Sequence, residues 1–212
     1  MKLAEFQKVG AMLAKQHKIS VIQGNSWAAN IKERKVFYKK EDIYNLSEEH
    51  ILGFTLHEIA HIHYTGDVPT PPKNKELTHS TLNMLEDIAI ESIIANDYPN
   101  AGEILQSTKQ EVIDTLVKML PKMEDVSVYE KSLLYAATKF EGRGYAFSTE
   151  PYEKLGDKIS TIMFKRQKEI YGRKHTKDLI PIAQEIVDLI IKEAGEPNDD
   201  EKRQLMQSAE DE

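Results

Sequence analysis

Two histidines and a glutamate lie close together in His57-Glu58-Ile59-Ala60-His61, a stretch of the form HExxH. Residues i and i+4 lie one above the other on a helix face, so both imidazoles could bind one zinc ion. Glu58, beside the first imidazole, could take a proton from water held by that ion. The motif therefore predicts zinc-dependent hydrolysis with Glu58 as general base.

A zinc site of this kind needs a third protein ligand, and the chain has no cysteine to supply it. The segment predicted as a second long helix offers Asp87, with Asn83 and Glu91 four residues to either side on the same face. We expect Asp87 to bind the metal. We expect Glu91 to accept a hydrogen bond from the far nitrogen of a ligand histidine, as carboxylates behind metal ligands commonly do.

Two other acids are alternatives for the third ligand. Glu86 projects among apolar residues of the same helix, where an unpaired carboxylate would be costly, so a metal or another cation would explain its position. Asp67 lies six residues after His61, the spacing of the third ligand in metzincins, but Tyr64 stands where those enzymes have a glycine. We favour Asp87 over Glu86, and both over Asp67.

The elements around the motif predict an α+β fold. Ser47 followed by two glutamates marks the start of the motif helix, which should run to about Tyr64 before Gly66. We expect a minimal zincin-like domain over residues 1–100. Its elements are an N-terminal helix at 2–17, a small antiparallel sheet from strands near 19–23, 27–31 and 36–38, the HExxH helix, and a second ligand helix at 77–97.

The remainder of the chain is expected to be an all-helical layer. A helical subdomain should cover residues 101–195, and polar, acidic residues 196–212 predict a disordered tail. The expected helices of this layer are about 103–119, 127–140, 150–171 and 176–194.

The segment 47–100 resembles the metallopeptidase-like region of cobaltochelatase T-subunit-type proteins and of related VWA-associated, often phage-encoded, proteins. The residues that carry the resemblance follow the motif: Thr65 and Asp67, the pattern N-x-x-E-D-x-x-x-E over residues 83–91, and Tyr98-Pro99. The resemblance implies a zincin-like metallopeptidase domain. An arginine is common in those proteins where this chain has Ala89, and the remaining residues leave no room for a VWA domain, so cobalt chelation is not carried over.

Composition narrows the expected partners and location. The net charge is −7, and residues 51–120 carry 10 acidic side chains against 4 basic ones, which does not favour nucleic acid as a partner. There is no run of about 18 apolar residues and no secretory signal pattern, so we expect a cytoplasmic protein that does not span a membrane.

Two functions fit these observations. The first is a zinc metallopeptidase that cleaves a peptide or protein substrate, which could pair in extended form with the strand near residues 28–31. The alternative is a catalytically silent metal-binding scaffold or assembly protein, with a protein partner on the helical C-terminal half. Because Glu58 is present, we favour the enzyme. Tyr64, Tyr145 and His175 are candidates for stabilising an oxyanion.

Overall fold

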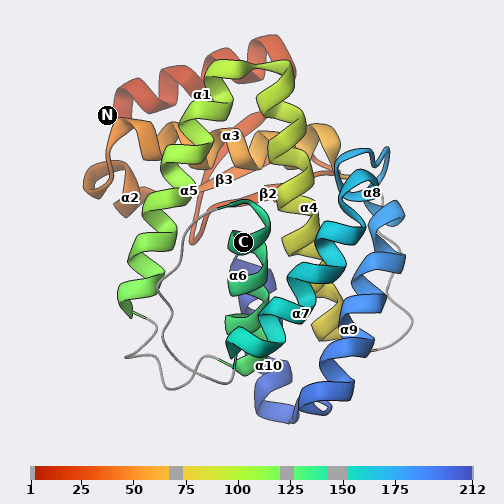
Figure 1. Ribbon diagram of the computed structural model, residues 1–212. Helices are drawn as coiled ribbons and strands as arrows, with labels where there is room; N and C mark the ends of the chain where they lie inside the picture. The colour runs from red at the N-terminus through yellow and green to blue at the C-terminus, as the bar shows by residue number, and fades with distance from the viewer. Residues whose placement is uncertain (1–2, 67–73, 120–126, 143–151, 212) are drawn as a thin grey trace. The chain divides into compact units, whose positions relative to one another are not determined.

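Helices make up most of the computed structural model, which describes residues 3–66, 74–119, 127–142 and 152–211 (Figure 1). A three-stranded sheet lies near the N-terminus, so the expected α+β class is confirmed at this level. In the part of the chain that the structure describes, no helix is long and apolar enough to cross a membrane.

The chain forms two compact units, which we describe separately. The first comprises residues 1–65, 90–115 and 211–212, and the second comprises residues 66–89 and 116–210. The boundary expected at residue 100 therefore falls inside a segment of the first unit.

The sheet of the first unit consists of β1 (Ser20–Gly24), β2 (Ala28–Asn30) and β3 (Lys35–Lys39), in the order β1-β3-β2. β2 is antiparallel to β3, but β1 is parallel to β3. The sheet is mixed, so the prediction of an antiparallel sheet is wrong for β1. The alternation of apolar residues locates strands, but it does not reveal that β3 inserts between the two strands that precede it.

Two apolar clusters connect this sheet to its helices. α1 (Leu3–His17), α2 (Lys40–Asn45) and α3 (Glu48–Tyr64) form the N-terminal helices. The sequence did not predict the short α2. One cluster contains Phe6, Trp27, Tyr38, Ile43 and Ile51, and the other contains Ile19, Val36, Ile59 and Ile62. Because Ile59 and Ile62 belong to α3, the motif helix is held against the sheet by its apolar face.

Local signals place the start of α3 where it was expected. Ser47 is the N-cap residue, and its hydroxyl accepts a hydrogen bond from the backbone N–H of His50. The helix ends at Tyr64, as predicted.

Two long helices complete the first unit. α4 (Lys75–Asp97) begins in the second unit and ends in the first, and α5 (Pro99–Met119) follows it after Tyr98. Ala60 of α3 packs with Ile90, Ile94, Ala101 and Leu105 of these two helices. α5 also approaches α3 closely at Gly53, where a Cβ atom would overlap the side chain of Thr108.

The second unit is helical and has its own core, in which α6, α7 and α9 lie alongside one another (Figure 1). Its elements besides α4 are α6 (Val128–Phe140), α7 (Tyr152–Lys165), α8 (Gln167–Tyr171), the 3-10 turn η2 (Thr176–Leu179), α9 (Ile180–Ala194) and α10 (Asp199–Asp211). The helix expected over 150–171 is interrupted at Arg166, which precedes α8.

The C-terminal segment, expected to be disordered, forms α10. Leu205 of this helix is fully buried in the core of the second unit. The backbone carbonyl of Leu205 also accepts a hydrogen bond from the hydroxyl of Ser80. A polar segment with one well-placed apolar residue can thus dock onto a core, which composition alone does not indicate.

The close approach at Gly53 gives a test of the packing between α3 and α5. We expect Gly53→Ala to lower the free energy of unfolding by about 1–3 kcal/mol, because overpacking outweighs the roughly 1 kcal/mol that alanine gains over glycine in a helix. Urea unfolding measures the change. In Gly10→Ala the new Cβ would lie 3.1 Å from Cβ of Val21, so its loss should be smaller. Equal or greater stability of Gly53→Ala would contradict the packing described.

Candidate metal centre

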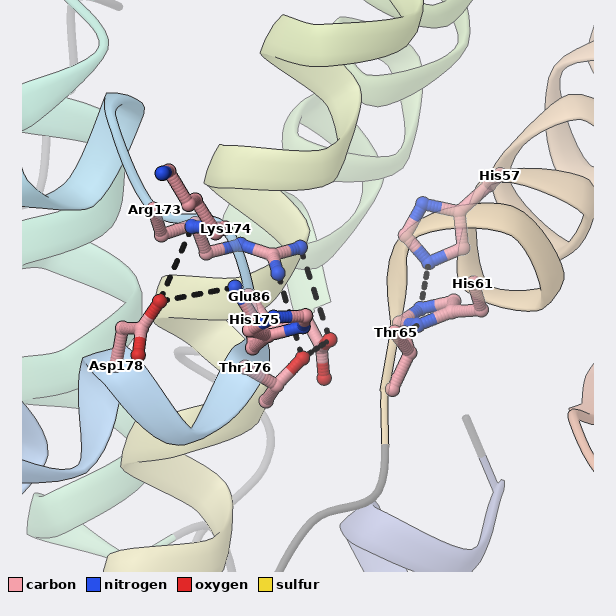
Figure 2. Close-up of polar contacts among 9 residues, drawn as sticks. All are labelled: His57, His61, Thr65, Glu86, Arg173, Lys174, His175, Thr176 and Asp178. Atoms are coloured by element: carbon pink, nitrogen blue, oxygen red, sulfur yellow. Dashed lines mark hydrogen bonds and ion pairs between the residues drawn. The ribbon is translucent and has the colours of Figure 1, made fainter.

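His57 and His61 lie one turn apart on α3, and their Nε2 atoms are 3.2 Å apart (Figure 2). Two imidazole ligands of a tetrahedral zinc ion, each about 2.05 Å from it, would have their nitrogens about 3.3 Å apart. The separation of the two rings therefore fits a metal ion held by both Nε2 atoms.

The other nitrogen of each ring also has a partner. Nδ1 of His57 lies 3.0 Å from Oε1 of Glu91, which is the hydrogen bond expected for this carboxylate. Nδ1 of His61 lies 3.0 Å from Oγ1 of Thr65. Histidines that bind metals usually have such a partner on the far nitrogen, because it fixes the ring orientation. Both rings are thus oriented with Nε2 toward each other.

The sequence did not reveal the role of Thr65. This residue is the C-cap of α3 and is buried, with 8% of its surface exposed. It follows His61 by four residues, so its hydroxyl comes back to the last turn of the helix. The sequence signal that could have indicated this role is the position of Thr65, a hydroxyl residue four positions after His61 at the end of the motif helix.

Lys109 was also missed, and it contributes to the lowered pKa of Glu91. Burial raises the pKa of Glu91. The ammonium of Lys109 and the hydrogen bond with His57 lower it by more, so the resulting pKa is about 2. Nζ of Lys109 lies 2.8 Å from Oε2 of Glu91. Glu91 is therefore an anion at neutral pH. Lys109 belongs to α5, and no spacing in the sequence connects it to the motif.

Asp87 completes a group that could hold a metal ion. It precedes Glu91 by one turn of α4, so the helix itself places the two carboxylates on one face. One carboxylate oxygen of Asp87 and one nitrogen each of His57 and His61 all lie within 4.8 Å of one another, and the three residues are half-buried. Among the described residues, this is the one group of three or more such side chains found. Two imidazoles and a carboxylate are a donor set that suits zinc.

Glu86, the alternative third ligand, has other partners in the second unit. It is 3% exposed and accepts a hydrogen bond from the hydroxyl of Thr176 (Figure 2). Its Oε1 lies 3.8 Å from Nη2 of Arg173, which is itself buried. The buried carboxylate does have a cation beside it, as the sequence suggested, and that cation is an arginine.

The remaining candidate residues are distributed as follows. Glu58 lies on α3 and is 3% exposed, which makes it the most buried member of the motif apart from Ala60. Asn83 lies on α4, one turn before Asp87, and is half-buried. Asp67 is outside the described residues.

Two of the three oxyanion candidates, Tyr64 and His175, lie in the described part of the chain, and each makes a hydrogen bond to an aspartate. The hydroxyl of Tyr64 donates a hydrogen bond to Asp97 at 2.7 Å. Burial and this hydrogen bond raise the pKa of Tyr64 to about 12. The backbone N–H of His175 donates to Asp178 at 3.0 Å (Figure 2). Tyr145 lies outside the described residues.

The chain matches no protein-family model, no curated protein and no solved structure. The resemblance of residues 47–100 to metallopeptidase-like proteins therefore stays a prediction. What the site does has to follow from its own residues and distances.

Zinc content is the first test of the site. We expect the purified protein to hold about one zinc ion per chain, and His57→Ala or His61→Ala to abolish it, because a site with three protein ligands cannot replace a lost imidazole. Elemental analysis of the dialysed proteins measures this. Stoichiometric zinc in either variant would rule out the assignment.

A second test compares the two neighbouring acids of α4. We expect Asp87→Ala to weaken zinc binding at least tenfold while the free energy of unfolding of the metal-free protein stays near that of the wild type. Glu86→Ala should instead cost about 3 kcal/mol of unfolding free energy, because it removes the carboxylate beside the buried Arg173, and should leave zinc binding nearly unchanged. Chelator competition and urea unfolding measure the two effects. A folded Glu86→Ala protein without zinc would identify Glu86 as the ligand.

Proposed function

We propose that the chain is a zinc-dependent metallopeptidase that hydrolyses a peptide bond. The observation that carries the proposal is the pair of Nε2 atoms of His57 and His61, 3.2 Å apart, with a carboxylate of Asp87 in the same group and Glu58 beside it in the sequence. This combination provides metal ligands and a general base together.

The metal site would consist of His57, His61 and Asp87. A zinc ion bound there would supply Lewis acidity, lowering the pKa of water toward neutrality and polarising a carbonyl group. Glu91 and Thr65 hold the two imidazole rings in orientation through their Nδ1 atoms. These two residues therefore determine where the ligand nitrogens point.

Glu58 is the general base of this proposal. It follows His57 directly and is not a member of the metal group, so its carboxylate can accept a proton from the attacking water and pass it to the leaving amine. Proton transfer requires a fixed geometry, and a buried side chain on a helix provides one.

An extended peptide suits the sheet beside α3. β2 is an edge strand, since β3 is its neighbour on one side in the order β1-β3-β2, and α3 packs against it. A substrate in extended conformation could add to the outer edge of β2 through main-chain hydrogen bonds. This supports a peptide as the substrate class.

The decisive variant is Glu58→Gln, which keeps the size of the side chain but removes the proton acceptor. We expect zinc content and fold to be retained while peptide hydrolysis falls by about 10²–10⁴-fold, the usual contribution of a general base. Digestion of a peptide library at equal zinc loading, by wild type and variant, measures the loss.

The same experiment separates the enzyme from a metal-binding scaffold. If the wild type with full zinc cleaves nothing across a broad library, the peptidase proposal fails. A protein partner that binds wild type and Glu58→Gln equally well would then support the scaffold.

A further inference from the structure

Lys109 on α5 contacts the metal centre indirectly, through Glu91. We propose that Lys109 is a positioning residue of the zinc site, which holds the Glu91 carboxylate in the orientation in which it fixes the ring of His57. The inference rests on the proposed zinc site and adds a residue to it that the HExxH motif does not contain.

The two oxygens of Glu91 have different partners. Oε1 lies 3.0 Å from Nδ1 of His57, and Oε2 lies 2.8 Å from Nζ of Lys109. A glutamate side chain with a single contact keeps much of its rotational freedom, whereas contacts on both oxygens fix the carboxylate plane. Lys109 thereby restricts the carboxylate that orients the ligand ring.

The packing of α5 brings Lys109 to this position. Thr108, the preceding residue, lies against Gly53, which is one turn before His57 on α3. Ala101 and Leu105 of α5 belong to the same buried cluster as Ala60 of the motif. The backbone of Lys109 is thus fixed relative to the helix that carries the ligands.

Burial distinguishes this ion pair from the surface pairs of the chain. The side chains of Lys109 and Glu91 are 20% and 14% exposed. In the pair of Lys158 and Glu193 the corresponding values are 51% and 33%, and exposed pairs of that kind contribute little. A half-buried lysine on a shared carboxylate requires another explanation, and positioning of Glu91 provides one.

The direction in which zinc affinity changes when Lys109 is removed distinguishes a positioning role from a purely electrostatic one. A cation near a zinc ion repels it, so removal of Lys109 would tighten zinc binding if the lysine acted only through its charge. If Lys109 positions Glu91, its removal weakens zinc binding, because residues behind the ligands are typically worth 10–100-fold in metal affinity.

The test is the zinc affinity of Lys109→Met, measured by chelator competition on the full chain. We expect a loss of about tenfold, and Lys109→Arg, which keeps a cationic donor, to recover most of it. Gln110→Met is the matched control, because it introduces the same side chain at the next position of α5, and it should bind zinc like the wild type. Lys109→Ala replaces the Met variant if that variant does not fold. Unchanged or tighter zinc binding in Lys109→Met, or in Lys109→Ala where that variant replaces it, would overturn the proposal.

A second readout does not need the metal. In chelator-treated protein, NMR should detect the Nδ1 proton of His57 hydrogen-bonded to Glu91, and this proton should exchange faster with water in Lys109→Met than in the wild type or Gln110→Met. Equal exchange in all three proteins would overturn the role of Lys109 even if zinc binding and hydrolysis were shown. Failure of the wild type to hydrolyse peptides would refute the peptidase and leave this result unaffected.

Discussion

The hydrogen bond between His57 and Glu91 determines most of the candidate site. It joins two residues 34 positions apart and lies on the face of α4 whose Ile90 and Ile94 pack with Ala60 of α3. Asp87 is one turn before Glu91 on the same helix face, and its carboxylate is the third member of the group that could hold a metal ion. Lys109, which the packing of α5 places next to Glu91, contacts the other oxygen of the same carboxylate. The motif helix supplies the imidazoles, but the second helix decides whether they form a site.

Those parts of the site that depend on helix periodicity could be predicted from the sequence. The i, i+4 spacing placed His57 and His61 together, and the same spacing on the next helix placed Asp87 and Glu91 on one face. Thr65 and Lys109 could not be found in this way. The role of Thr65 depends on how α3 ends, and that of Lys109 on the packing of α5 against α3, which follows from a glycine at position 53 and from apolar contacts rather than from any spacing. The order of the strands was missed for the same reason, because pairing between distant segments is a tertiary property.

Glu86 shows that a buried carboxylate can be recognised in the sequence although its partner cannot. A carboxylate predicted to face apolar residues needs a compensating partner, and the structure provides Thr176 and Arg173. The partner lies about ninety positions away and cannot be identified from burial alone. In the sequence, Glu86 therefore looked like a metal ligand, whereas its carboxylate lies beside Arg173 and Thr176 in the second unit. The segment after residue 195 was misjudged for a related reason. Its composition suggested disorder, but the buried Leu205 packs α10 into the core of the second unit.

His57 and His61 share a motif, but the residues that contact their Nδ1 atoms are chemically unequal. The carboxylate of Glu91 can only accept a hydrogen bond, so in the neutral ring of His57 the proton lies on Nδ1 and the lone pair on Nε2. The hydroxyl of Thr65 can donate as well as accept, so it is compatible with either tautomer of His61. Only one of those tautomers presents a lone pair at Nε2. Of the two neutral rings, that of His57 is therefore restricted to the tautomer suited to binding through Nε2, whereas that of His61 can occupy either one.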